Sequence, residues 1–265
     1  MKIKVNGQQY LVEQGGSGQP TWLLLHGFMG SHADFGQIVG GLPGQVLTVD
    51  LLGHGQTTAS HDPWDYDMAQ QAADLAAILA QLEITHVNLV GYSMGGRLAL
   101  GFALGYPELV GKLFLESSTA GIADDHQRRQ RVEKDELQAR QLERELFTKF
   151  IAHWENLPLF ASQRQLPEEQ QAAIRTQRLA QDPLALAASL RGMGTGAMPN
   201  FWDRLGGLTC PITLIAGELD QKFQRITAKM AELIPDAKRV VVTGAGHNVH
   251  QEQPAAYLRI LKGEQ

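Results

Sequence analysis

Three residues of the types that combine to remove and transfer protons follow short apolar runs in this sequence. Ser93 stands at the centre of a G-x-S-x-G pattern, and Asp220 and His247 follow later apolar runs. An imidazole can take the proton of a serine hydroxyl, and a carboxylate can hold that imidazole in the required tautomer. The order serine, acid, histidine is the order of one such arrangement built at strand ends. We therefore predict that these three residues form a catalytic triad.

The glycines at positions 91 and 95 predict the local geometry of the serine. Strand-like residues 87–90 precede the pattern, and helix-like sequence follows from Gly96. Side chains at positions 91 and 95 would collide across so sharp a bend, which would hold Ser93 in a strained conformation with its hydroxyl exposed. We expect a nucleophile elbow; a glycine-rich turn without a catalytic role is the alternative.

Two backbone N–H groups near Ser93 could stabilise an oxyanion. Met94 follows the serine at the start of the expected helix, and Phe28 lies in a turn after the apolar run 22–25. Gly27 would let the backbone approach closely, so we predict that the N–H groups of Phe28 and Met94 form an oxyanion hole. For the side chain of His26 we expect a role in shaping this loop.

Other interpretations stay open for several of these residues. Asp220 could be a helix N-cap, and His247 could be an ordinary surface-loop histidine. Glu116 follows the apolar run 113–115 and is a rival acid, or it could brace a loop. His250, three residues after His247, is expected to be solvated.

Asp50 and His54 also follow an apolar run, but they precede Ser93, so we expect them to build a turn. The histidines and the single cysteine show no metal-ligand spacing, and no phosphate-binding glycine motif lies between a strand and a helix. We therefore expect no metal site and no nucleotide chemistry.

The elements that must position these residues alternate between strands and helices. Residues 2–5 and 8–13 flank Asn6-Gly7, a strong hairpin signal. Six short apolar runs indicate buried strands, at 22–25, 46–49, 87–90, 113–115, 212–215 and 239–242. Helical stretches lie at 67–82, 95–105, 223–233 and 254–262. This alternation predicts an α/β fold with a mostly parallel sheet, helices on both faces and an antiparallel hairpin at its start.

Residues 121–205 interrupt this alternation with helix-like, strand-poor sequence. They hold 10 of the 14 arginines of the chain, and 12 acidic and 12 basic residues overall. We expect a helical cap over the ends of the strands, where open α/β sheets bind ligands. The core would then comprise 1–120 and 206–265.

The composition excludes several classes of protein. The 265 residues are 43% hydrophobic and carry a net charge of −5, which argues against disorder and against a nucleic-acid binder. No apolar run approaches the roughly 20 residues of a membrane span, and the N-terminus shows no signal-peptide pattern. Cys210 stands alone, so internal disulfides are excluded. We expect a cytoplasmic protein without membrane insertion, and its oligomeric state stays open.

Several segments carry a resemblance to a known family. The chain resembles α/β-hydrolase-fold proteins, and it is similar in particular to the 2-succinyl-6-hydroxy-2,4-cyclohexadiene-1-carboxylate synthases of menaquinone biosynthesis. The segments that carry this similarity are 91–97, 116–118, 154–162, 189–196, 217–223 and 245–247. The segments 154–162 and 189–196 are specific to that family rather than to the fold. Leu52 departs from the proline of many relatives, but it affects only a turn.

The resemblance implies a lyase that needs no cofactor. Members of the family eliminate pyruvate from 2-succinyl-5-enolpyruvyl-6-hydroxy-3-cyclohexene-1-carboxylate, with the triad serine as the base. This small-molecule substrate carries three carboxylates, and guanidinium groups match carboxylates two bonds at a time. Arg97, one helical turn past the elbow, suits such a substrate.

Further binding residues follow from position within the family pattern. They are Arg131, Arg178 and Trp154 in the cap, with Tyr92 and Lys222 as weaker candidates. Cap arginines spaced four residues from a glutamate could instead face solvent. An esterase or thioesterase with the same triad is the alternative function, and a non-catalytic binding protein is the second.

Overall fold

The computed structural model describes residues 1–264 and contains one sheet of eight strands in the order β1-β2-β4-β3-β5-β6-β7-β8. The strands are Lys2–Val5 (β1), Gln8–Gly16 (β2), Thr21–Leu25 (β3), Gln45–Val49 (β4), Val87–Tyr92 (β5), Val110–Glu116 (β6), Ile212–Gly217 (β7) and Lys238–Val242 (β8). β1 and β2 pair antiparallel across Asn6-Gly7, β2 pairs antiparallel with β4, and all other pairs are parallel. The expected hairpin and the six expected strands are therefore confirmed, but the expected burial of residues 239–242 is wrong: β8 lies at the edge of the sheet, and only Val242 of this strand is buried.

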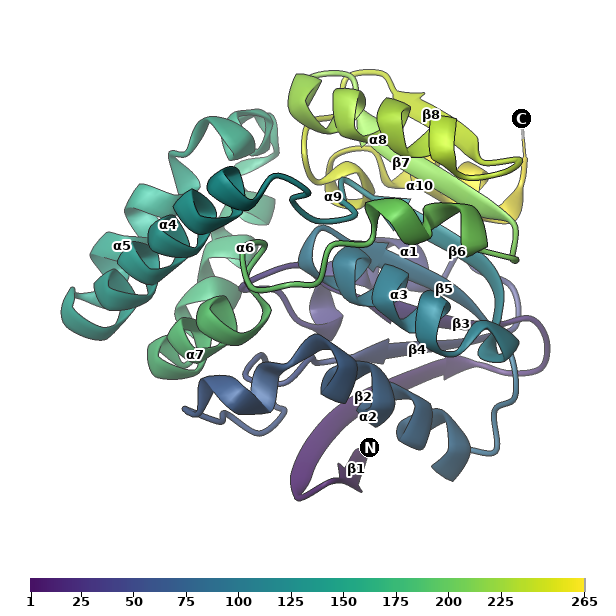
Figure 1. The fold of residues 1–265 in the computed structure, drawn as a ribbon, viewed down its shortest axis with the longest axis horizontal. Helices are drawn as coiled ribbons and strands as arrows, with labels where there is room; N and C mark the ends of the chain where they lie inside the picture. Colours follow the sequence, from purple (N-terminus) through teal and green to yellow (C-terminus); the bar gives the residue numbers. More distant parts are fainter. Residues whose placement is uncertain (265) are drawn as a thin grey trace.

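Helices cover both faces of this sheet (Figure 1). Met68–Gln81 (α2), Met94–Gly105 (α3) and Gln221–Leu233 (α8) pack on one face, where they share an apolar core with residues such as Leu23 and Leu214. Gly36–Val39 (α1), Val249–Glu252 (α9) and Pro254–Lys262 (α10) pack on the other, around Leu24 and Phe114. Alternate residues of one strand thus enter different cores, as expected for a sheet buried on both faces. Within residues 1–264, no helix has the length and apolar character needed to cross a bilayer.

A group of helices inserted between β6 and β7 lies to one side of the sheet (Figure 1). These are Asp125–Arg144 (α4), Phe147–Glu155 (α5), Glu168–Leu179 (α6) and Pro183–Met193 (α7), with a short 3-10 segment at Pro158–Gln165 between α5 and α6. They build a third apolar cluster that also takes in Met29 of the core. We call this group the cap.

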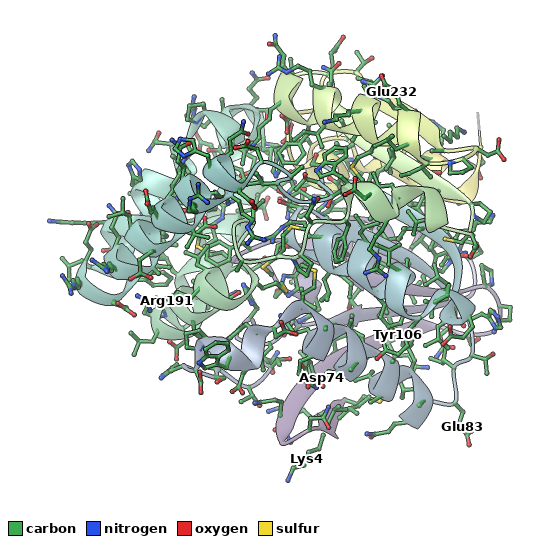
Figure 2. All side chains as sticks on the ribbon, in the orientation of Figure 1. Lys4, Asp74, Glu83, Tyr106, Arg191 and Glu232 are labelled. Carbon is green, nitrogen blue, oxygen red and sulfur yellow. The ribbon has the colours of Figure 1, made fainter. Side chains whose placement is uncertain are left out.

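Arg191 joins two helices of the cap at its outer end (Figure 2). Arg191 belongs to α7, and its guanidinium donates to Glu136 at 2.7 Å and to Glu143, two residues of α4. This arginine is occupied within the cap, so the local excess of arginine is partly structural.

Candidate active site

Ser93 lies in a strained turn between β5 and α3. Its φ of 50° and ψ of −104° fall where residues with a side chain are rarely found. A Cβ at Gly91 would lie 2.5 Å from the carbonyl oxygen of Gly95, so the first glycine is required by the bend itself. A Cβ at Gly95 would instead lie 2.2 Å from the carbonyl oxygen of Leu25. The second glycine therefore lets α3 approach the end of β3, rather than avoiding a collision with position 91.

The structure brings Ser93, Asp220 and His247 together. The Ser93 Oγ lies 3.1 Å from Nε2 of His247, and Nδ1 of His247 lies 2.7 Å from Oδ2 of Asp220. Asp220 follows β7 and His247 follows β8, and both side chains are buried. With Nδ1 protonated, the imidazole donates to the carboxylate and presents a lone pair to the serine hydroxyl. This is the geometry that a serine needs to lose its proton to a base.

Asp220 also caps a helix. Its Oδ1 accepts from the backbone N–H of Phe223 at 3.1 Å, while Oδ2 faces the imidazole. The two interpretations of this residue are therefore compatible. The cap bond fixes the carboxylate, so the second oxygen is held in place for His247.

A half-buried carboxylate holds the loop around His247, and the sequence analysis missed it. Glu252 accepts from the N–H of Gly246 at 2.6 Å and from the N–H of Asn248 at 3.3 Å. The hydroxyl of Ser162, from the cap, donates to the same carboxylate at 3.0 Å. Burial raises the pKa of Glu252 above its ordinary value. Its donors come from both sides of the histidine and from a segment 90 residues away, so no local pattern marks it.

The backbone N–H groups of Phe28 and Met94 donate no hydrogen bond to any residue in the range 1–264. Both residues line the same cavity as Ser93. His26 is fully buried in the loop before Phe28; its Nδ1 donates to the Gly27 carbonyl at 2.7 Å and its Nε2 accepts from Leu51 at 3.0 Å. The side chain thus shapes the loop, as expected, and leaves the backbone donors free. Gly27 has a further role, since a Cβ there would lie 2.6 Å from the ring of Tyr92.

A cavity of about 700 Å³ opens above the serine, between the strand ends and the cap. Ten of the eleven candidate site residues line it: Phe28, Tyr92, Ser93, Met94, Arg97, Arg131, Trp154, Arg178, Lys222 and His247. Asp220 lies behind the imidazole. The aromatic rings of Tyr92, Phe160 and Phe223 surround His247, with centroids 5.5, 6.0 and 4.7 Å from its own. Aromatic rings therefore make up much of the immediate surroundings of the imidazole.

Arg97 is a buried cation at the wall of this cavity. It is about 8% exposed, and its Nη1 donates to the carbonyl oxygen of Met193 at 2.6 Å. No carboxylate within residues 1–264 lies within 4.0 Å of its guanidinium. Burial, together with the nearby charge of Arg131, lowers the pKa of Arg97 to about 10. A buried cation without an anionic partner is costly, so its place beside an open cavity suits an anionic ligand.

The two cap arginines have partners of different kinds. Arg131 pairs with Asp135 at 2.7 Å, one turn along α4. Arg178 is buried, donates to Gln163 at 3.0 Å and lies 5.3 Å from the centroid of the Phe160 ring. Its remaining ion pair, with Glu155, is long at 3.5 Å. A guanidinium has five N–H donors, and neither arginine uses all of them in these contacts. Arg178 and Arg131 therefore both have N–H groups left for a ligand in the cavity.

Trp154 and Lys222 also line the cavity. The Trp154 ring packs between Phe28 and Phe160, with centroid distances of 5.4 and 5.6 Å. Lys222, two residues after the triad acid, lies over the ring of Phe223 at 5.1 Å. Partial desolvation of its ammonium group and the charge of Arg131 lower the pKa of this lysine, although the residue as a whole is exposed.

Glu116 and His250 form a second buried acid–histidine pair, and the expectation that His250 is solvated is wrong. Its Nδ1 donates to Oε2 of Glu116 at 2.8 Å, its backbone N–H donates to Oε1 at 3.1 Å, and both side chains are fully buried. Glu116 contacts His250 rather than His247, so it braces the segment that carries His247. Its carbonyl oxygen also accepts from the N–H of Ser93 at 2.9 Å.

Asp50 and His54 build the turn after β4. Asp50 accepts from the backbone N–H of His32 at 2.6 Å and of Gln56 at 2.8 Å. His54 is buried, and its Nδ1 lies 2.9 Å from the carbonyl oxygen of Leu52. Among residues 1–264, no group of three histidine, cysteine or acidic side chains is arranged to hold a metal ion.

Comparison with known proteins shows the fold family to which this chain belongs. The profile of a family described as alpha/beta hydrolase fold matches residues 20–254, and the chain belongs to that family. A protein of Bacillus subtilis, provisionally named 2-succinyl-6-hydroxy-2,4-cyclohexadiene-1-carboxylate synthase, is 40% identical over 97% of this chain and 94% of its own. The synthase of that name from Enterobacter sp. is 32% identical over 93% and 92%.

Solved structures agree with the sequence relatives. A structure described as MenH from S. aureus superposes with a TM-score of 0.91 at 35% identity, over 95% of this chain and 96% of the other. An esterase from Thermogutta terrifontis, solved with malate bound, reaches 0.87 at 27% identity, over 99% and 96%. Within the α/β-hydrolase fold, the chain therefore belongs to the 2-succinyl-6-hydroxy-2,4-cyclohexadiene-1-carboxylate synthase family.

Proposed function

We propose that this protein is a carbon–oxygen lyase of menaquinone biosynthesis. It eliminates pyruvate from 2-succinyl-5-enolpyruvyl-6-hydroxy-3-cyclohexene-1-carboxylate to give 2-succinyl-6-hydroxy-2,4-cyclohexadiene-1-carboxylate, without a cofactor. The observation that carries this proposal is a triad that opens on a cavity with a buried, carboxylate-free guanidinium, Arg97. The relatives of this chain that carry the synthase name support the same reaction.

In this reaction Ser93 acts as the base. His247 accepts the serine proton at Nε2, and the serine oxygen takes the ring proton next to the succinyl ketone. The electrons of that C–H bond shift through the ring, the carbon–oxygen bond to the enolpyruvyl group breaks, and pyruvate leaves as its enolate, which takes up a proton. Asp220 stabilises the imidazolium that forms. The surrounding rings exclude water, so proton transfer competes less with hydration of the charges.

Charge develops on the ketone oxygen as the proton leaves. The N–H groups of Phe28 and Met94 suit this oxygen, since neither has an acceptor among residues 1–264 and both line the cavity beside Ser93. The guanidinium groups of Arg97, Arg131 and Arg178 bind the carboxylates of the substrate. Tyr92, Trp154 and Lys222 complete the binding surface. The aromatic rings of Tyr92 and Trp154 pack against the carbon ring of the substrate.

An esterase is the second candidate, because the Thermogutta terrifontis esterase is similar in fold and sequence. The two functions differ in whether Ser93 becomes acylated. We expect the purified protein to release pyruvate from the enolpyruvyl substrate, with little hydrolysis of p-nitrophenyl esters and no covalent adduct in the intact mass during turnover. Rapid ester hydrolysis with an acylated protein and no pyruvate would assign an esterase instead.

A further inference from the structure

A row of cations lies along one face of α8. Lys222, Arg225 and Lys229 are spaced by three and four residues, so they share one side of the helix over roughly 10 Å. All three are exposed, and all three line the same cavity as the triad. We call these residues the α8 strip. Lys222 stands at its inner end, two residues after Asp220.

The charges of the strip are not neutralised by neighbours. Within residues 1–264, none of the three cations has a carboxylate within 4.0 Å, and none donates a side-chain hydrogen bond. Two lie against aromatic rings: Lys222 over Phe223 at 5.1 Å, and Lys229 over Trp202 at 4.7 Å. Such contacts orient an ammonium group and leave its charge available.

The α8 strip shares its cavity with further cations. Arg97, Arg131 and Arg178 line the same cavity, so six guanidinium or ammonium groups lie around it. The two acidic residues of the lining are both engaged: the carboxylate of Asp124 caps α4 through the N–H of Gln127 at 2.8 Å, and that of Asp34 accepts from Gln177 at 2.6 Å. The lining of the cavity is therefore strongly positive.

This local charge runs against the charge of the whole chain. The net charge is −5, and the cap region 121–205 is balanced, so the core carries the entire negative charge. A polyanion that approaches the molecule is repelled on average, and it is attracted only where cations gather. Clefts lined by one sign of charge raise the rate of association with ions of the opposite sign.

We propose that the α8 strip is an anion-docking path by which a polycarboxylate enters the cavity, with Arg225 and Lys229 as the outer docking residues. They act before the substrate reaches Arg97 and the triad, and they make no contact with the reacting atoms. The proposal rests on the proposed function only for the identity of the anion, because any tricarboxylate would be drawn in by the same charges.

The test is the double variant Arg225→Gln/Lys229→Gln, measured across ionic strength. A trianion about 10 Å from two missing charges should lose about 10-fold in kcat/KM near 20 mM salt and about 2- to 3-fold near 150 mM. Wild type and variant should converge near 0.5 M, with kcat unchanged throughout. Arg225→Lys/Lys229→Arg should behave as wild type, because it keeps both charges.

A matched control removes the same net charge elsewhere. Lys112 and Arg259 are exposed, and neither lines the cavity of the triad, so Lys112→Gln/Arg259→Gln should change kcat/KM less than 2-fold at any salt concentration. Identical behaviour of the strip and control variants would overturn the proposal. A loss that persists at 0.5 M salt, or one that appears in kcat, would also overturn it, because either would show a direct contact instead.

Binding of propane-1,2,3-tricarboxylate, measured by calorimetry at low salt, separates this proposal from the proposed function. If the wild type fails to release pyruvate, the function is wrong, while weaker tricarboxylate binding by the strip variant than by the control variant still supports the path. Equal binding by the two variants would refute the path, whatever the reaction.

Discussion

Replacing Arg97 by methionine should separate the binding of a carboxylate from the stability of the fold. Methionine keeps an unbranched, apolar side chain in the buried site and removes the guanidinium. In the native protein that group donates to the carbonyl oxygen of Met193 and, at 3.8 Å, to the sulfur of Met198, and no carboxylate within residues 1–264 lies within 4.0 Å of it. The substrate would supply the missing anion.

Arg97→Met should lower kcat/KM strongly and change the free energy of unfolding only slightly. A charge-assisted bond to a carboxylate contributes about 1.5–3 kcal/mol, so its loss should lower kcat/KM by roughly 10- to 150-fold. Burial lowers the folded-state pKa of Arg97 to about 10, below its value in the unfolded chain, so at neutral pH the folded state carries a cost for this charge. Removing the charge relieves at most about 3 kcal/mol, and the orphaned carbonyl of Met193 costs about 1–3 kcal/mol. These terms offset, and Tm should change by only a few degrees.

Steady-state release of pyruvate and thermal unfolding followed by circular dichroism provide the two readouts. A tricarboxylate should raise the Tm of the wild type and raise that of Arg97→Met much less, because a ligand stabilises only the state that binds it. Arg97→Lys should recover part of kcat/KM, since an ammonium group restores charge without the planar pair of donors. Arg140→Ala and Arg144→Ala, exposed on α4, are the controls.

Two results would refute this reasoning. Arg97→Met with native kcat/KM would show that the substrate does not use this guanidinium. A fall in Tm of 10 °C or more would show that Arg97 is a structural brace for Met193, and the loss of activity would then follow from misfolding.

Other consequences can be checked with the same assays. Ser93→Ala and His247→Ala should each lower kcat by orders of magnitude, and the double variant should lose little more; additive losses would contradict a triad that acts as a unit. Arg131→Ala and Arg178→Ala should each reduce kcat/KM by about 10-fold or more with the fold intact, and near-native values at low and moderate salt would remove both from the site. Burial raises the pKa of the Cys210 thiol, so at pH 7.5 it should react with Ellman's reagent more slowly than glutathione does, and Cys210→Ser should keep full activity. Rapid modification with loss of activity would contradict this.

The elements of the fold, and the proximity of Ser93, Asp220 and His247, were predictable because their signals are local. A buried parallel strand is a short apolar run, and the residue after it reaches the ligand edge of the sheet. Ser93, Asp220 and His247 follow such runs, so strand position alone brings them to one edge. The cap was predictable as the place where this alternation stops.

Side-chain partners were not predictable, because they join distant segments. His250 is 134 residues from Glu116, and nothing near either residue indicates a buried pair. The bond from Arg97 to Met193 and the bond from Ser162 to Glu252 also depend on how the cap sits on the core. The α8 strip is an exception: its helical spacing is visible in the sequence, but only the cavity shows that this face matters.

The pair of Glu116 and His250 limits how this protein can change. Both groups are fully buried, and loss of one partner would strand the other in a dry interior, which costs several kcal/mol. The two positions should therefore vary together in evolution, with few viable intermediates that differ at one of them. In a mutant library, joint apolar replacement at 116 and 250 should yield more folded proteins than separate randomisation. The backbone carbonyl of Glu116 also accepts from the N–H of Ser93. Activity measurements on such a replacement would therefore show whether Ser93 keeps its function when the side chains packed beside its turn are changed.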